Sequence, residues 1–327
     1  MRFALQIEPQ QGLSYGEQVA VAKCAEANGF ETFFRSDHYA SFPGPAGLPT
    51  TDAWAVLAGL ARDTERIGIG TLLSPVTFRH PGNLAKVATT VDEMSGGRLE
   101  VGLGAGWNEL EHRQLGLPFP SIGERADLLE DQVAILHGLW GEPDGWSYDG
   151  RHVSIAEAKF WPKPVDVPGR PRTSIGTARP RIIVGGGGTP RSYRIAARYA
   201  DEFNLSSASG PDKVREVCAA LDAACQAIGR DPATLTRSAM IGVLVGRNEG
   251  EVKDRLAATV QALGSGDDAD DWLAERERRW ITGTPDQARE TVRRLADAGL
   301  ERIMLQDFLP CDLDMIDVMG EVLIGQV

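Results

Sequence analysis

Short apolar runs alternate along the chain with longer stretches of helical periodicity. An apolar run with little internal alternation is typical of a parallel strand that helices cover. Such runs predict eight strands, at 2–7, 31–36, 66–73, 98–104, 181–186, 202–206, 238–246 and 301–306. Amphipathic periods predict helices at 15–28, 51–63, 81–94, 123–139, 190–199, 211–228, 249–263, from 285 onward, and at 313–323.

The repeated strand–helix unit predicts the fold class. Eight such units indicate an α/β protein with a single-domain (β/α)8 TIM barrel. A barrel needs about 250 residues, so a chain of 327 residues leaves room for insertions at the C-terminal mouth. We place these near 105–122, 144–180 and 264–283. The Asp149-Gly150 pair predicts a hairpin in the second insertion, and the acidic-to-basic order of 267–279 predicts a surface helix in the third.

Composition and charge narrow the class of protein. Hydrophobic residues make up 42% and charged residues 24%, as in soluble globular chains. A net charge of −12 argues against a nucleic-acid or anionic-membrane partner. No apolar run reaches the ~18 residues of a membrane span, and residues 1–12 are typical of a strand and not of a signal peptide. The four cysteines form no CxxC motif, so we expect reduced thiols and a cytoplasmic protein.

Barrel enzymes place their active sites where strands end, and the second strand is followed by Ser36-Asp37-His38. A histidine titrates near neutral pH and can donate or accept a proton. We therefore predict His38 as a catalytic acid or base, with Asp37 orienting its ring. The alternative is a structural histidine that bonds to the loop backbone.

Four consecutive glycines follow the fifth strand, at Gly185, Gly186, Gly187 and Gly188. Glycines let backbone N–H groups approach a ligand closely, and the N-terminus of the next helix attracts an anion. Thr189 adds a hydroxyl group and Arg191 a positive charge. The run exceeds what a tight turn requires, so it predicts a phosphate-binding loop. No Gly-Lys-Ser/Thr follows, which excludes a Walker A loop.

The segment GLGAGW at 102–107 resembles a dinucleotide fingerprint only superficially. A Rossmann motif requires a helix that begins at the last glycine, whereas a loop with Pro118 and Pro120 intervenes here. The small residues fit the approach of a flat ring better. The sequence contains no HExxH motif, EF-hand loop or Cys/His cluster that would predict a metal site. It also contains no GxSxG motif, which would predict a nucleophile elbow.

Together these segments resemble the bacterial luciferase-like monooxygenase superfamily, and most closely its branch that uses the deazaflavin coenzyme F420. The resemblance covers nearly the whole chain. It rests on SDH at 36–38, GTLLSPVTFRHP at 70–81, EMSGGRLEVGLGAGWNELEH at 93–112, FWPKP at 160–164, IIVGGGGTPRSYRIAARYADEFN at 182–204 and GTPDQARETVRRLADAGLERIMLQ at 283–306.

The resemblance implies that F420, or alternatively FMN, binds at the barrel mouth. It implies a non-prolyl cis peptide at Leu72–Leu73 behind the ring and a role for His38. Thr71, Ala105 and Gly106 would line the ring, and Gly187, Gly188 and Thr189 would hold the phosphate. For the longer tail of F420 we expect a basic groove with Arg191, Arg194 and Lys159. We also expect a homodimer.

One departure from the family bears on the substrate. Sugar-phosphate dehydrogenases of this branch carry a glutamate where this chain has Trp107. Because an indole cannot take a proton, we expect an apolar or aromatic small-molecule substrate that contacts Trp107 and Asn108. Two alternatives stay open beside an F420-dependent hydride transfer: an FMN-dependent monooxygenase that uses oxygen, and a non-catalytic cofactor-binding protein. A Rossmann dehydrogenase is the weakest reading.

Overall fold

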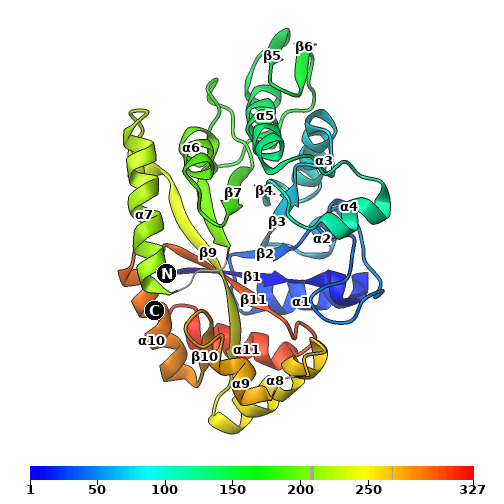
Figure 1. Cartoon of the computed structure of the whole chain (residues 1–327). Helices are drawn as coiled ribbons and strands as arrows, with labels where there is room; N and C mark the ends of the chain where they lie inside the picture. Colours follow the sequence, from blue (N-terminus) through cyan, green and yellow to red (C-terminus); the bar gives the residue numbers. More distant parts are fainter. Residues whose placement is uncertain (207–209, 267) are drawn as a thin grey trace.

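The computed structural model describes residues 1–206, 210–266 and 268–327 and shows a closed parallel barrel surrounded by helices (Figure 1). Around the barrel the strands are β1 (Arg2–Ile7), β2 (Thr32–Arg35), β3 (Gly68–Pro75), β4 (Leu99–Gly104), β7 (Arg181–Gly186), β8 (Glu202–Ser206), β9 (Thr236–Val245) and β11 (Arg302–Asp307). Pairing of β8 with β9 and of β11 with β1 completes the closure. The predicted (β/α)8 barrel is confirmed.

The helices bury their apolar faces against the outside of the barrel. They are α1 (Tyr15–Ala27), α2 (Ala53–Asp63), α3 (Pro81–Met94), α5 (Ile122–Gly141), α6 (Pro190–Tyr199), α7 (Pro211–Gln226), α8 (Glu249–Ala262), α10 (Pro285–Asp297) and α11 (Leu313–Leu323). Local sequence determines where they begin. Ser14 and Glu17 form a capping box at α1, and proline occupies the first turn of α3, α6, α7 and α10.

Each of the three segments expected as insertions contains secondary structure in the described part of the chain. The predicted hairpin is present as β5 (Trp146–Asp149) and β6 (Ser154–Ala158). The first insertion contains a helix that was not predicted, α4 (Glu109–Leu115). In the third, the helix is only α9 (Ala269–Ala274), and Trp272 is buried against α8, so this insertion packs as part of the fold. A short strand, β10 (Ile281–Gly283), pairs with β9.

The N-terminal end of the barrel is filled by a buried ionic cluster around Arg302. Its guanidinium donates to Glu100 at 2.7 Å, to Glu202 at 3.1 Å and to the Thr32 hydroxyl at 2.7 Å. Burial opposes ionisation of Glu100, but the Arg302 charge prevails and lowers its pKa to about 2. This end is therefore closed, which leaves the C-terminal end for a ligand.

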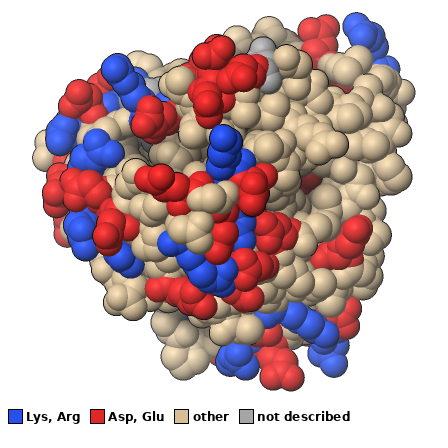
Figure 2. Space-filling view, turned by 90° about the horizontal axis from the view of Figure 1, so that it is seen from below, with Lys and Arg blue, Asp and Glu red and all other residues tan. Residues whose placement is uncertain are grey.

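Surface charges of both signs lie next to one another on the face seen from below, over α8 and α11 (Figure 2). Arg247 pairs with Asp314 at 2.8 Å and Arg255 with Asp312 at 2.9 Å. The acidic excess therefore forms no unbroken acidic field there. None of the helices in the described part of the chain is long and apolar enough to cross a membrane.

Candidate active site

A cavity of about 840 Å³ opens at the C-terminal ends of the barrel strands. Its size is that of a typical cofactor or drug-sized ligand site. Most of the predicted site residues line it: His38, Leu72, Leu73, Ala105, Gly106, Trp107, Gly185, Gly186, Gly187, Thr189 and Arg191. The sequence motifs therefore converge on one site although they are far apart along the chain.

One wall of the cavity is formed by the end of β3. The Leu72–Leu73 peptide is cis, as the resemblance implies, and the β3–β4 register shifts at this point. The Leu73 side chain lies against β7, and a Cβ at Gly185 would collide with it. Glycine is therefore needed there for close packing. Thr71 does not line the cavity, because its side chain is buried and donates to the Gly102 carbonyl at 3.1 Å.

The glycine loop, residues 185–188, leads into α6. Among the described residues, no acceptor is hydrogen-bonded to the N–H groups of Gly187 or Gly188. A Cβ at Gly187 would meet no atom within 4 Å, so the space above this residue is open. Gly188 itself does not line the cavity, and its φ of +81° favours glycine. The loop fits an anion at the positive end of the α6 dipole.

Thr189 and Arg191 already have partners beside this loop. Thr189 caps α6 in a capping box with Ser192. The Arg191 guanidinium is ion-paired with Asp127 and donates to the Gly123 carbonyl at 3.1 Å. Lys159 and Arg194, predicted to join a basic groove, are exposed and do not line the cavity.

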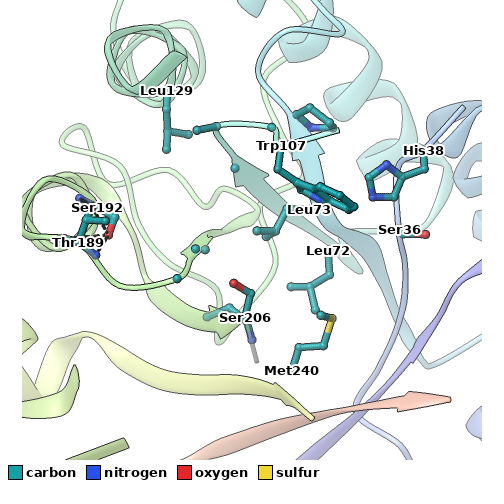
Figure 3. A pocket seen from close by; sticks show the side chains of 18 of the residues that line it. Ser36, His38, Leu72, Leu73, Trp107, Leu129, Thr189, Ser192, Ser206 and Met240 are labelled. Carbon is teal, nitrogen blue, oxygen red and sulfur yellow. Dashed lines mark hydrogen bonds between the residues drawn. The ribbon is translucent and has the colours of Figure 1, made fainter. Parts of the chain in front are cut away.

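At the other end of the cavity, His38 is held by a buried carboxylate that the sequence analysis missed. Its Nδ1 lies 2.9 Å from the Glu111 carboxylate, which also accepts from the Tyr39 N–H at 2.9 Å. Glu111 is only 1% exposed and belongs to α4. Figure 3 shows His38 beside Trp107, across the cavity from Thr189 and Ser192, with Leu72 and Leu73 between.

The prediction that Asp37 orients His38 is wrong. Asp37 is fully buried, accepts from the Ser74 hydroxyl at 2.7 Å and pairs with Arg79 at 2.5 Å. Neighbouring side chains of an extended segment point to opposite sides, and Asp37 points away from the cavity. Its charge is neutralised by Arg79 behind the site.

The rings of His38, Phe42 and Trp107 pack edge to face against one another. The ring centroids of His38 and Phe42 are 4.4 Å apart, those of Phe42 and Trp107 5.2 Å, and those of His38 and Trp107 5.9 Å. Trp107 is 66% exposed, so its indole offers surface to a planar ligand. Asn108 does not contribute to the cavity lining, because it is the N-cap of α4 and its side chain accepts from the Leu110 N–H at 3.1 Å.

Comparisons with known proteins identify the family of the chain. The sequence model of the family described as luciferase-like monooxygenase matches residues 1–302. An F420-dependent glucose-6-phosphate dehydrogenase of Microbacterium testaceum is 32% identical over 210 residues, which is 63% of this chain and 57% of that protein. The chain spans between 54% and 64% of the length of several curated relatives that it matches.

Two solved structures share the fold over nearly the whole chain. An F420-dependent secondary alcohol dehydrogenase in complex with an F420-acetone adduct has a TM-score of 0.81 at 18% identity, covering 98% of both chains. The monooxygenase RslO1 from Streptomyces bottropensis has a TM-score of 0.80 at 22% identity, covering 99% of both chains. At these identities the likeness concerns the fold.

Proposed function

The chain belongs to the luciferase-like monooxygenase family, and from that premise we propose an oxidoreductase that transfers a hydride between coenzyme F420 and a small organic substrate. One observation carries the proposal. A single cavity has an open glycine loop at one end and the His38–Glu111 pair at the other, with the Leu72–Leu73 peptide between them. Relatives at about a third identity that are named F420-dependent support the choice of cofactor.

The residues present fit a deazaflavin. The free N–H group of Gly187, which lines the cavity, would hold a phosphate at the start of α6, with that of Gly188 next to it at the cavity edge. Leu73, Ala105 and Gly106 would pack against a flat ring, because their small or apolar groups line the cavity between its two ends. When bound, F420 supplies the hydride chemistry, and the protein supplies orientation and the exclusion of water.

His38 would hold or release the proton that accompanies hydride transfer. Its Nδ1–H donates to the Glu111 carboxylate, so Nε2 is the nitrogen left for a substrate. Glu111 is a positioning residue, since it fixes the ring and stabilises the positive charge of a protonated imidazole. The neighbouring Phe42 and Trp107 rings would pack against a substrate at this end of the cavity.

A second candidate, an FMN-dependent monooxygenase, is favoured by one observation. The glycine loop fits the single phosphate of FMN as well as that of F420, while among the described residues that line the cavity no unpaired basic side chain extends the loop for a longer anionic tail. Arg191 is neutralised by Asp127, and Lys159 and Arg194 lie outside the lining. The fold likeness to the monooxygenase RslO1 agrees with either candidate.

Substrate assays with each cofactor separate the candidates. Reduced F420 is supplied without oxygen together with neutral enones and nitroaromatic compounds, and the absorbance of the deazaflavin is followed. We expect oxidation that depends on both enzyme and substrate. If the protein instead consumes oxygen with reduced FMN and leaves reduced F420 untouched, the monooxygenase reading replaces the first. A protein that binds F420 but turns over neither this panel nor cationic imines of similar size would support the non-catalytic alternative.

A further inference from the structure

A buried carboxylate that the sequence analysis did not single out faces the cavity from the end of β1. Glu8 follows this strand, lines the cavity and is 6% exposed. Both of its oxygens accept hydrogen bonds from amides, at 2.8 Å from Gln10 Nε2 and at 2.6 Å from Gln306 Nε2. Both carboxylate oxygens of Glu8 therefore act as hydrogen-bond acceptors at the cavity wall.

Glu8 belongs to the same wall as His38. The Gln10 side chain that donates to Glu8 also donates to the Phe42 carbonyl at 3.1 Å and accepts from the Ser36 hydroxyl at 2.6 Å. The Phe42 ring in turn packs against His38. A substrate that reaches His38 therefore lies close to the Glu8 wall, on the side of the cavity away from the glycine loop.

The Glu8 carboxylate has no cationic partner among the residues that the structure describes. Throughout residues 1–206, 210–266 and 268–327, no lysine, arginine or histidine nitrogen comes within 4.0 Å of Glu8. The guanidinium that lines the cavity, that of Arg191, is already paired with Asp127, and His38 is engaged by Glu111. A buried charge without a counter-ion is costly, so a ligand that brings a positive charge recovers part of that cost.

We propose that Glu8 selects substrates that carry a positively charged nitrogen, such as an iminium or a protonated amine, within an apolar or aromatic body. The inference deepens the proposed oxidoreductase by naming the charge of its substrate. Phe42 and Trp107 suit such a group, because the faces of aromatic rings attract cations. The Glu8 carboxylate would repel an anionic substrate such as a sugar phosphate.

Binding of three probes of similar size tests the assignment without turnover. The probes are the N-methyl-3,4-dihydroisoquinolinium cation, neutral 1-tetralone and the anion 1-naphthoate, titrated by calorimetry into the protein without cofactor. We expect the cation to bind about tenfold or more tightly than the neutral probe, and the anion to bind weakest. Equal affinities of the cation and the neutral probe would overturn the proposal.

Variants separate a charge effect from a change of shape. Glu8→Gln should lose the preference for the cation and keep the affinity for 1-tetralone, while Glu8→Asp should retain the preference. Glu109→Gln removes an exposed carboxylate of α4 and should change nothing, which excludes a general surface effect. If Glu8→Gln weakens the neutral probe as much as the cation, Glu8 only supports the cavity and the assignment fails.

A separate titration of F420 distinguishes failure of this inference from failure of the proposed function. If the native protein does not bind F420, the proposed oxidoreductase fails, whatever the probes show at Glu8. If Glu8→Gln lowers the affinity for F420 and leaves the probe preference intact, Glu8 contacts the cofactor and the substrate assignment is overturned. We expect the F420 affinity of this variant to match that of the native protein.

Discussion

Asp307, at the end of β11, gives a pH-dependent test of the structure. It is fully buried, one side-chain oxygen accepts from the Leu309 N–H at 2.7 Å, and the other has no hydrogen-bond partner among the described residues. Burial raises its pKa from the ordinary 3.8 to about 7, and the nearby charge of Asp312 acts in the same direction. The folded protein therefore keeps this proton to higher pH than the unfolded chain does.

The direction in which stability changes with pH depends on whether the folded or the unfolded protein holds the Asp307 proton. Well below pH 3.8 both states hold the proton, and the group does not make stability depend on pH. As the pH rises from about 4 to about 7, the unfolded chain releases the proton while the folded protein retains it, so stability falls. A pKa raised from 3.8 to about 7 corresponds to at most about 4 kcal/mol at pH 8.

Replacing Asp307 by Asn removes this penalty because the amide does not ionise. The free energy of unfolding is measured by urea denaturation of both proteins between pH 4 and pH 8. We expect the variant to gain stability relative to the native protein as the pH rises, with the gain levelling off above pH 7. Asp297→Asn, at an exposed position of α10, serves as the control and should show a flat difference. A flat difference for Asp307→Asn as well would refute this account of the buried carboxylate.

Three further predictions concern the cavity. Gly187→Asp should weaken F420 binding at least tenfold by placing a carboxylate where the N–H groups are free, whereas Gly187→Asn should weaken it far less; equal losses in equilibrium titrations would refute an anion site. His38→Ala should keep F420 binding and slow turnover by about 10²–10⁴, and Glu111→Gln should slow it less and move the pH profile; unchanged rates would make both residues structural. Trp107→Ala should raise KM for aromatic substrates with little change in F420 affinity, and an unchanged KM would place the substrate elsewhere.

The sequence predicted correctly those features of the fold that depend on residues close together along the chain. Apolar runs and capping residues located the strands and helices, because each depends on neighbouring residues. Strand ends meet at one mouth of a barrel, so His38, Trp107 and the glycine loop could be assigned to one site before their distances were known. The cis Leu72–Leu73 peptide came from the family resemblance and not from the residues themselves.

The sequence analysis failed where a side chain's direction depends on distant partners. Asp37 stands beside His38 in sequence, but Arg79, which is 42 residues away, holds it behind the site. Glu111 reaches His38 only because an unpredicted helix crosses the mouth. Asn108 caps that helix, and the buried Thr71 hydroxyl bonds to the Gly102 carbonyl of β4. Each of these outcomes depends on contacts between elements, which periodicity does not encode.

We propose that the cavity binds a deazaflavin and uses it for hydride transfer. The most direct test is an equilibrium titration of the purified protein with F420, FMN and NADPH side by side, read by fluorescence and calorimetry. We expect saturable binding of one F420 per chain, weaker binding of FMN and none of NADPH. Tight binding of FMN with indifference to F420, or binding of NADPH alone, would contradict it.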